Sequence, residues 1–473
     1  MKNEDKRSKS AMDACRPHLG FGSHPKTRAR VKKRDDKFWK RVAKSSKKWH
    51  EAIAGKDVCY SHFFNPQHPD VFIIPRGRNI HLVDTYGDSA VLTMIKMPLS
   101  STDFFIDFFT GDEETNLFVE LYHTNAFFRL GGISQLGYLI PPRPDDWLDK
   151  SVKISFFLPT FPHTRLTHCL LTGILMEVIM ARNGFSKKER ATPVLAAACH
   201  DIAMPAGGDS IMRIDPKNLS EEINFSWVLR NAGLDKSWAQ MFGFDIESAA
   251  RWVQGKDMFG RLLDVLDKIS YTAIDCQHIG VVRPSKVREL GYQYPLMMDV
   301  WQDIRFNRDK TDFGFCDPER LFHFLLARAY EHVELLQNPY SRVLDFYLDQ
   351  MVRPMYEAGV VNRETLLTCN DEWLNVLIGE YHKIDTICIA QPELYSWRKF
   401  PTAQEADDFR RDIGMRFGHA EYLKGFKTGL DWQVYTKKDK MIPLRFLISQ
   451  AKVRQMERMV ESVKGYYVYY FND

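Results

Sequence analysis

The chain has 473 residues, of which 44% are hydrophobic, 27% charged and 13% aromatic, and its formal net charge is +4. This composition is that of a globular protein with a sizeable core, and it excludes a wholly disordered, collagen-like or disulfide-scaffold chain. The charge is unevenly placed, because residues 1–50 carry 17 Lys and Arg against 5 Asp and Glu. Such a basic stretch suits contact with nucleic acid, and a solvated tail leading into a charged helix is the simpler alternative.

No apolar run reaches the roughly 20 residues that a membrane-spanning helix needs, so we expect no membrane contact. The charged N-terminus MKNEDKRSKS is not followed by the apolar region of a secretory signal. The eight cysteines include no C-x-x-C pair, which is typical of thiols in a reducing compartment. We therefore expect a cytoplasmic protein.

The first part of the chain predicts a basic disordered arm over residues 1–34, because it lacks periodic apolar positions. Residues 35–117 predict an amphipathic helix, up to about Ala54, followed by a small antiparallel β unit. The expected strands are VFIIP (71–75), NIHLVD (79–84) and AVLTMIKM (90–97), separated by Gly-containing turns.

Residues 118–396 predict an all-helical core, interrupted by a Pro-rich break at 140–147 and a short strand at 153–159. The remaining residues, 397–473, predict a mixed α+β extension whose last aromatic run, YYVYYF, is either a strand or a buried tail. The predicted fold class is therefore mostly α, with small β units at both ends of the core. The long helical segments are expected at 166–182, 189–203, 260–279, 319–337, 341–358 and 365–384.

Three places in the predicted core offer ligands for a metal ion. His168 stands at the start of one apolar helix, His200 and Asp201 close a second, and Asp267 lies on a third. Imidazole nitrogens and carboxylate oxygens suit a first-row divalent ion. Neighbouring residues on a regular helix point about 100° apart, so the His-Asp pair can share one ion only where the helix ends. The Pro- and Gly-containing stretch 203–208 predicts that ending.

These blocks resemble those of the HD-domain phosphohydrolases, and within them the deoxynucleoside-triphosphate triphosphohydrolases of the sterile-alpha-motif and HD-domain type. The resemblance covers about residues 118–380 and implies an HD-domain core. It rests on FFRLGGISQLG (127–137), HTRLTH (163–168), ACHDIA (198–203), LDKISYTAIDCQHIG (266–280) and LFHFLLARAYEHVELLQN (321–338).

The resemblance implies one divalent metal ion (Mn, Fe, Zn or Mg), three cationic side chains for the substrate phosphates and a group of residues that shape the sugar end of the pocket. In the fourth block, Asp267, Tyr271 and Asp275 are spaced four residues apart, which places them on one helix face; a solvated charged face is the alternative. The implied metal ligands are His168, His200, Asp201 and Asp267; the phosphate-binding residues are Arg165, Lys268 and Arg328; the sugar-end residues are Gln135, Leu136, Tyr271 and Asp275.

The chain departs from the family where the proton donor to the leaving group is expected. Met204 and Asp209 stand where the family has histidines after the His-Asp pair, and Glu221 replaces a histidine on the following helix. A carboxyl group acts as a general acid only when burial or a neighbouring carboxylate raises its pKa. Asp209 and Glu221 are therefore the candidate catalytic residues.

The leading hypothesis is a metal-dependent phosphohydrolase that acts on nucleotides, with release of nucleoside and tripolyphosphate from a deoxynucleoside triphosphate as its most specific form. The alternative is an HD module that has lost catalysis and binds nucleotide or nucleic acid as a regulatory or structural protein. The resemblance also implies a homo-oligomer.

Overall fold

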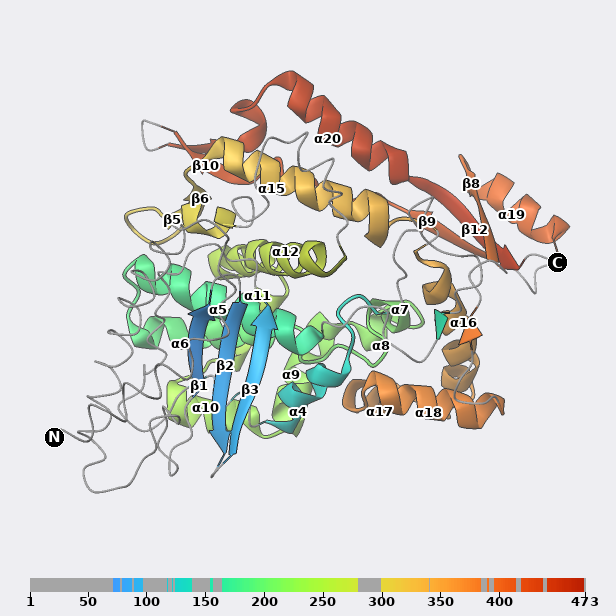
Figure 1. Cartoon of the computed structure of the whole chain (residues 1–473), viewed down its shortest axis with the longest axis horizontal. Helices are drawn as coiled ribbons and strands as arrows, with labels where there is room; N and C mark the ends of the chain where they lie inside the picture. The colour runs from blue at the N-terminus through green and yellow to red at the C-terminus, as the bar shows by residue number, and fades with distance from the viewer. Residues whose placement is uncertain are drawn as a thin grey trace, which may run out of the picture. The chain divides into compact units, whose positions relative to one another are not determined.

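The chain was analysed as a computed structural model (Figure 1). It divides into two compact units, Met1–Lys96 with Ser101–Glu120, and Met97–Ser100 with Leu121–Asp473. The predicted arm at 1–34 and helix at 35–54 lie outside the described residues. The structure describes residues 71–76, 79–86, 89–96, 117, 121, 124–137, 154–155, 164–279, 299–339, 341–383, 389–390, 395–413, 418–436 and 440–471.

The described part of the first unit is a three-stranded antiparallel sheet. Its strands are β1 (Val71–Arg76), β2 (Asn79–Tyr86) and β3 (Ser89–Lys96), paired in the order β1-β2-β3. The register places Leu82 opposite both Ile73 and Thr93. The predicted small β unit is thus confirmed.

The centre of the second unit is built from four long helices. They are α5 (Arg165–Arg182), α6 (Lys187–Ala198), α12 (Asp257–Ile279) and α15 (Pro318–Glu331). Helix α5 is buried on almost every side, as its apolar sequence predicts. It packs against α6 and α12, and α12 also contacts α15, so that α12 lies between α5 and α15 (Figure 1).

The packing of α5 on α6 is unusually close at one position. Gly173 of α5 faces Ala198, the last residue of α6, and a Cβ built on Gly173 would lie only 2.6 Å from the Ala198 Cβ. Helix α6 starts at a defined residue because Ser186 and Glu189 form a capping box. The capping box thus defines where α6 begins, and the Gly173–Ala198 contact sets the separation of the two helices. His168 lies on α5, and His200 follows the end of α6.

Further helices surround this centre. They are α4 (Asn125–Phe128), α7 (Asp209–Met212), α8 (Pro216–Leu219), α9 (Glu221–Asn231), α10 (Leu234–Phe242), α11 (Ile246–Val253), α16 (Val343–Glu357), α17 (Arg363–Thr368) and α18 (Asp371–His382). The single helix predicted at 365–384 is in fact two helices, because α17 ends at Thr368 and the Asn370 side chain caps α18 by accepting from the Trp373 N–H.

Two sheets connect the C-terminal part of the chain to the helices. The first has the order β11-β10-β6-β5, and in it β10 (Gln433–Tyr435) lies parallel to β6 (Phe313–Phe315). The second has the order β8-β12-β9 and contains YYVYYF as a strand. The other elements are β4 (Ile154–Ser155), β5 (Ile304–Phe306), β7 (Ile389–Ala390), β8 (Tyr395–Phe400), α19 (Ala403–Asp412), β9 (Gly418–Leu423), β11 (Met441–Pro443), α20 (Gln450–Val463) and β12 (Gly465–Phe471).

The fold is mostly α with small β units, as the sequence predicts. A short β5–β6 hairpin lies within the core that was expected to be wholly helical. Its sequence is interrupted by the polar loop 307–312, which is too short and too polar to show helical periodicity. Helix α20 packs on α15, so the C-terminal extension contacts the core directly.

We predict that Gly173→Ala lowers the free energy of unfolding by about 1–3 kcal/mol, because the added methyl group overpacks the α5–α6 contact. Helix propensity alone would favour alanine by up to about 1 kcal/mol, so the sign of the change is informative. Urea unfolding measures it. Gly131→Ala is the matched control, since its Cβ would meet Leu166 at an ordinary 3.4 Å. A Gly173→Ala variant as stable as the parent would contradict the prediction.

Candidate active site

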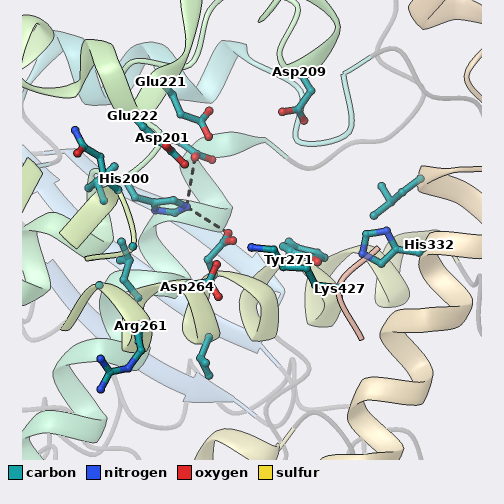
Figure 2. A pocket seen from close by; sticks show the side chains of 18 of the residues that line it. His200, Asp201, Asp209, Glu221, Glu222, Arg261, Asp264, Tyr271, His332 and Lys427 are labelled. Atoms are coloured by element: carbon teal, nitrogen blue, oxygen red, sulfur yellow. Dashed lines mark ion pairs between the residues drawn. The ribbon is translucent and has the colours of Figure 1, made fainter. Parts of the chain in front are cut away.

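Four side chains from three parts of the second unit converge on one point. His168 lies in the first turn of α5, His200 and Asp201 lie in the turn that follows α6, and Asp267 lies in the middle of α12. His168 Nε2 is 2.9 Å from His200 Nε2 and 3.1 Å from Asp267 Oδ1. His200 Nε2 lies 3.4 Å from both Asp267 Oδ1 and Asp201 Oδ1 (Figure 2). Helix α6 ends at Ala198, five residues earlier than the predicted end at 203, because Cys199 leaves the helical conformation. His200 and Asp201 therefore lie in a turn, which lets adjacent residues face one point.

These donor atoms have the separations that a shared metal ion requires. Metal–nitrogen and metal–oxygen bonds of about 2.1 Å place neighbouring donors about 3.0–3.4 Å apart. The observed separations run from 2.9 Å to the 3.7 Å between His168 Nε2 and Asp201 Oδ2. Nitrogen and carboxylate donors fit a divalent ion of the Mn, Fe, Zn or Mg group. The two histidines and the two carboxylates therefore fit a divalent metal ion.

The two imidazoles are oriented by their other ring nitrogens. His200 Nδ1 lies 2.8 Å from the carbonyl oxygen of Ala197, which can only accept a hydrogen bond, so Nδ1 carries a hydrogen and Nε2 is the nitrogen that faces the other candidate ligands. His168 Nδ1 lies 2.7 Å from the Ser270 hydroxyl. Such partners fix the tautomer and the ring plane of a metal-binding histidine.

Both carboxylates are ionised at neutral pH. Burial alone would raise the pKa of Asp267, but hydrogen bonds from His168 and His200 hold it well below its usual range. Burial likewise opposes ionisation of Asp201, and the neighbouring His200 and Arg165 lower its pKa. The two oxygens are thus prepared to bind a cation.

Two side chains that are not candidate metal ligands, Arg129 and Asp371, bind the backbone next to His200 and Asp201. The partly buried Arg129 guanidinium donates to the carbonyl oxygens of Ile202 and Met204, both at 2.9 Å, and to that of Cys369 at 2.8 Å. The Asp371 carboxylate accepts from the Gly207 N–H at 2.7 Å and from the Ser134 N–H at 2.9 Å. Arg129 and Asp371 therefore fix the backbone that follows the His-Asp pair.

A cavity of about 930 Å³ opens beside the metal ligands. His200, Asp201 and Asp267 form part of its wall, and Figure 2 shows Tyr271 and Lys427 between His200 and His332. Its volume is at the upper end of the range for small-molecule sites. The C-terminal segment contributes to its lining through Lys427, Asp431, Trp432 and Gln433.

The three cations predicted to bind phosphate differ in where they lie. Arg165 lines the cavity, and its two terminal nitrogens each lie 2.8 Å from a carboxylate oxygen, of Asp201 and of Asp209. The Lys268 ammonium pairs with the Asp264 carboxylate on its own helix. Arg328 donates to the Tyr271 hydroxyl and to the carbonyl oxygen of Lys427, both at 2.6 Å. Neither Lys268 nor Arg328 is among the described residues that line the cavity.

The residues predicted for the sugar end, Gln135, Leu136, Tyr271 and Asp275, all line the cavity. Asp275 is 1% exposed, and burial raises its pKa to about 7. Burial and the Asp275 carboxyl together raise the pKa of Glu331 on α15 well above its usual range. Asp275 and Glu331 therefore form a pair of buried carboxyl groups whose pKa values are both raised.

The two candidate proton donors lie on the side of the cavity opposite Asp264 and Arg261 (Figure 2). Asp209 is 63% exposed and is ion-paired with Arg165. Glu221 has a buried Oε2 without a hydrogen-bond partner among the described residues. Burial and the charges of Asp201 and Asp209 raise the pKa of Glu221 well above its usual range. The pKa of Glu221 is thus shifted in the direction that a general acid requires.

Sequence reasoning missed four residues that contact or complete this site. Ser270 follows Asp267 by three positions, so the same helix-face argument could have found it. Arg129 lies inside the FFRLGG block, but only the fold shows that it binds the ligand turn. Asp371 and Lys427 lie far from the other blocks in the sequence, and no local pattern marks either one.

No protein-family profile and no curated protein matches the sequence. Many solved structures have a similar fold, including one from Aquifex aeolicus and one from Bacteroides thetaiotaomicron. A hypothetical protein from Aquifex aeolicus is 17% identical with a TM-score of 0.55, and the match covers 76% of this chain and 92% of that one. A phosphohydrolase from Bacteroides thetaiotaomicron is 14% identical with a TM-score of 0.51, and the match covers 75% and 95%. The chain thus shares its fold with a phosphohydrolase. None of the helices in the described part of the chain has the length and apolarity to cross a bilayer.

We predict that Ser270→Ala weakens metal binding about 10–100-fold, because His168 loses the partner that orients its ring. Competition with a chelator measures the affinity. Ser341→Ala is the matched control, since Ser341 is also buried but its hydroxyl has no hydrogen-bond partner among the described residues. Equal metal affinities of the two variants would show that the Ser270 contact is dispensable.

A second prediction concerns stability and pH. The folded-state pKa of Asp275, about 7, is above the unfolded value near 4, so the stability that its proton confers is present below pH 4 and is lost as the pH rises to 7. Asp275→Asn removes this loss. The fall in unfolding free energy between pH 5 and pH 8 is expected to shrink by about 2–3 kcal/mol. Chemical unfolding at both pH values tests this, with Asp407→Asn on the exposed side of α19 as control; parallel curves for Asp275→Asn and the parent would contradict it.

Proposed function

We propose that the chain is a metal-dependent phosphohydrolase that acts on nucleotides. The observation that carries the proposal is the convergence of His168, His200, Asp201 and Asp267 at the wall of a large polar cavity. A binding-only pocket has no need of four ligands arranged for one ion. The similarity in fold to a phosphohydrolase supports the same reaction class.

A divalent ion held by these ligands would supply Lewis acidity, polarising a phosphoryl oxygen and lowering the pKa of water. Arg165 lies next to the ligand Asp201 with its charge directed to the cavity edge, where it stabilises the charge that develops on the phosphoryl oxygens. Arg offers two parallel donors for this purpose. The residues of this chain would thus orient the phosphoryl group and offset its charge.

Glu221 is the general acid in this proposal. Burial and the charges of Asp201 and Asp209 raise its pKa, which favours the protonated form, and it lies at the cavity wall, where it can give a proton to the departing oxygen. Asp209 has the different task of holding Arg165 through the ion pair at 2.8 Å. Two acidic groups thus take different roles because one is buried and the other is exposed.

The most specific form of the proposal is hydrolysis of a deoxynucleoside triphosphate to nucleoside and tripolyphosphate. Gln135, Leu136, Tyr271 and Asp275 line the cavity and would contact the nucleoside. The Asp275 carboxyl and the Tyr271 hydroxyl are suited to sugar hydroxyl groups, since each can accept and donate hydrogen bonds near neutral pH. We further propose that the chain is cytoplasmic and self-associates. Nucleic-acid contact through residues 1–50 stays a prediction, because those residues lie outside the described ones.

The decisive experiment combines metal analysis with a substrate panel of nucleotides, cyclic nucleotides and phosphomonoesters. We predict that the parent protein binds metal and releases product from a nucleotide. Asp201→Ala is expected to lose both metal and activity, whereas Glu221→Gln keeps the metal and loses about 10²–10⁴-fold in kcat. A metal-loaded parent that leaves the whole panel intact yet binds nucleotide would overturn the proposal and favour the regulatory or structural HD module.

A further inference from the structure

The cationic side chains of the cavity differ in one respect, namely whether an acidic partner already offsets their charge. Among the described residues, five cationic side chains line the cavity, and four are ion-paired. Lys427 is the fifth and forms no ion pair with any described residue. The paired ones are Arg165 with Asp201 and Asp209, Arg213 with Asp345, Arg261 with Asp312, and Arg342 with Glu421.

Lys427 belongs to the segment 424–432, which joins β9 to β10 and lies against α15. Two side chains of the core hold the backbone of this segment. Arg328 donates to the carbonyl oxygen of Lys427 at 2.6 Å, and Gln337 Nε2 donates to that of Gly425 at 2.8 Å. The backbone at Lys427 is therefore anchored while its ammonium remains available.

Two glycines, placed two residues before and two residues after Lys427, allow this close approach. Gly425 has φ +79° and Gly429 has φ +75°, a conformation that residues with a Cβ rarely adopt. A Cβ on Gly429 would lie 2.5 Å from a Leu325 methyl on α15, and one on Gly425 would lie 2.7 Å from Val460 on α20. Between them, Phe426 stacks flat on His332 with ring centres 4.7 Å apart.

The segment thus presents Lys427 from a fixed backbone, and Figure 2 shows it beside Tyr271, between His200 and His332. An ammonium group without a counter-ion on the wall of a cavity is stabilised by an anion that enters the cavity. Lysine binds phosphate as a compact point charge. The core cations Lys268 and Arg328 are engaged with Asp264 and with the segment itself, and neither is among the described residues that line the cavity.

We propose that Lys427 is a substrate-binding residue that holds a phosphoryl group other than the one at the metal ligands, so that the substrate carries a chain of at least two phosphoryl groups. This inference rests on the proposed function, in which one phosphoryl group lies at the metal. The C-terminal extension therefore supplies part of the substrate site.

The test compares two probes on the metal-loaded full chain by calorimetry, each complexed with magnesium: an α,β-imido deoxynucleoside triphosphate and the matching deoxynucleoside monophosphate. Lys427→Gln is expected to weaken binding of the triphosphate analogue about 10–100-fold, the worth of a charge-assisted hydrogen bond, and to change monophosphate binding less than about threefold. Lys427→Arg keeps the charge and should retain most of the affinity. Lys424→Gln, an exposed lysine of the same segment outside the cavity lining, is the matched control and should change neither.

Unchanged binding of the triphosphate analogue by Lys427→Gln would overturn the inference, as would an equal loss for both probes or no binding by the parent protein. The hydrolysis panel separates this result from the proposed function. Turnover with unchanged binding by Lys427→Gln would remove Lys427 and leave the hydrolase. Binding that depends on Lys427 without turnover of any substrate would retain the phosphate site and remove the hydrolase.

Discussion

The candidate active site depends on one packing constraint, the approach of α5 to the end of α6. A Cβ built on Gly173 would lie 2.6 Å from the Ala198 Cβ, so the helices can approach this closely only because residue 173 has no side chain. His200 follows Ala198 by two residues, and its Nε2 lies 2.9 Å from that of His168. A larger residue at position 173 would separate the helices, and the imidazole nitrogens with them. A small residue with no chemistry of its own thus sets the geometry of the ligands.

The charges around this point explain why a cation belongs there. Asp201 and Asp267 are both ionised, and of the cationic side chains Arg165 contacts only the first of them. Their repulsion in a buried position costs free energy unless positive charge lies between them. A divalent ion held here would offset both carboxylates and would be bound by the two imidazole nitrogens. Asp201, one of the residues that would hold the ion, also raises the pKa of Glu221.

The sequence was informative where function needs particular residue types at short spacing. The single face shared by Asp267, Tyr271 and Asp275 follows from local rules, and all three residues line the cavity. A helix end near His200 and Asp201 was also predicted, but α6 ends at Ala198, before this pair and not after it. The segment 365–384 forms two helices because the Asn370 side chain caps the second one. The spacing of apolar residues does not reveal such a cap. The positions of Lys268, Arg328 and Arg129 could not be predicted, because each is decided by a partner that only the fold brings near.

The engagement of the core cations gives the C-terminal extension a role at the site. Arg328 donates hydrogen bonds to the Tyr271 hydroxyl and to the carbonyl oxygen of Lys427. This one side chain therefore connects α12, α15 and the 424–432 segment. The β10–β6 pairing and the α20–α15 contact hold that segment in place from its C-terminal side. Lys268 and Arg328 of the core are thus used for internal contacts. In the proposed enzyme, the helical core supplies the metal ligands and Arg165, and Lys427 of the extension adds positive charge for a further phosphoryl group.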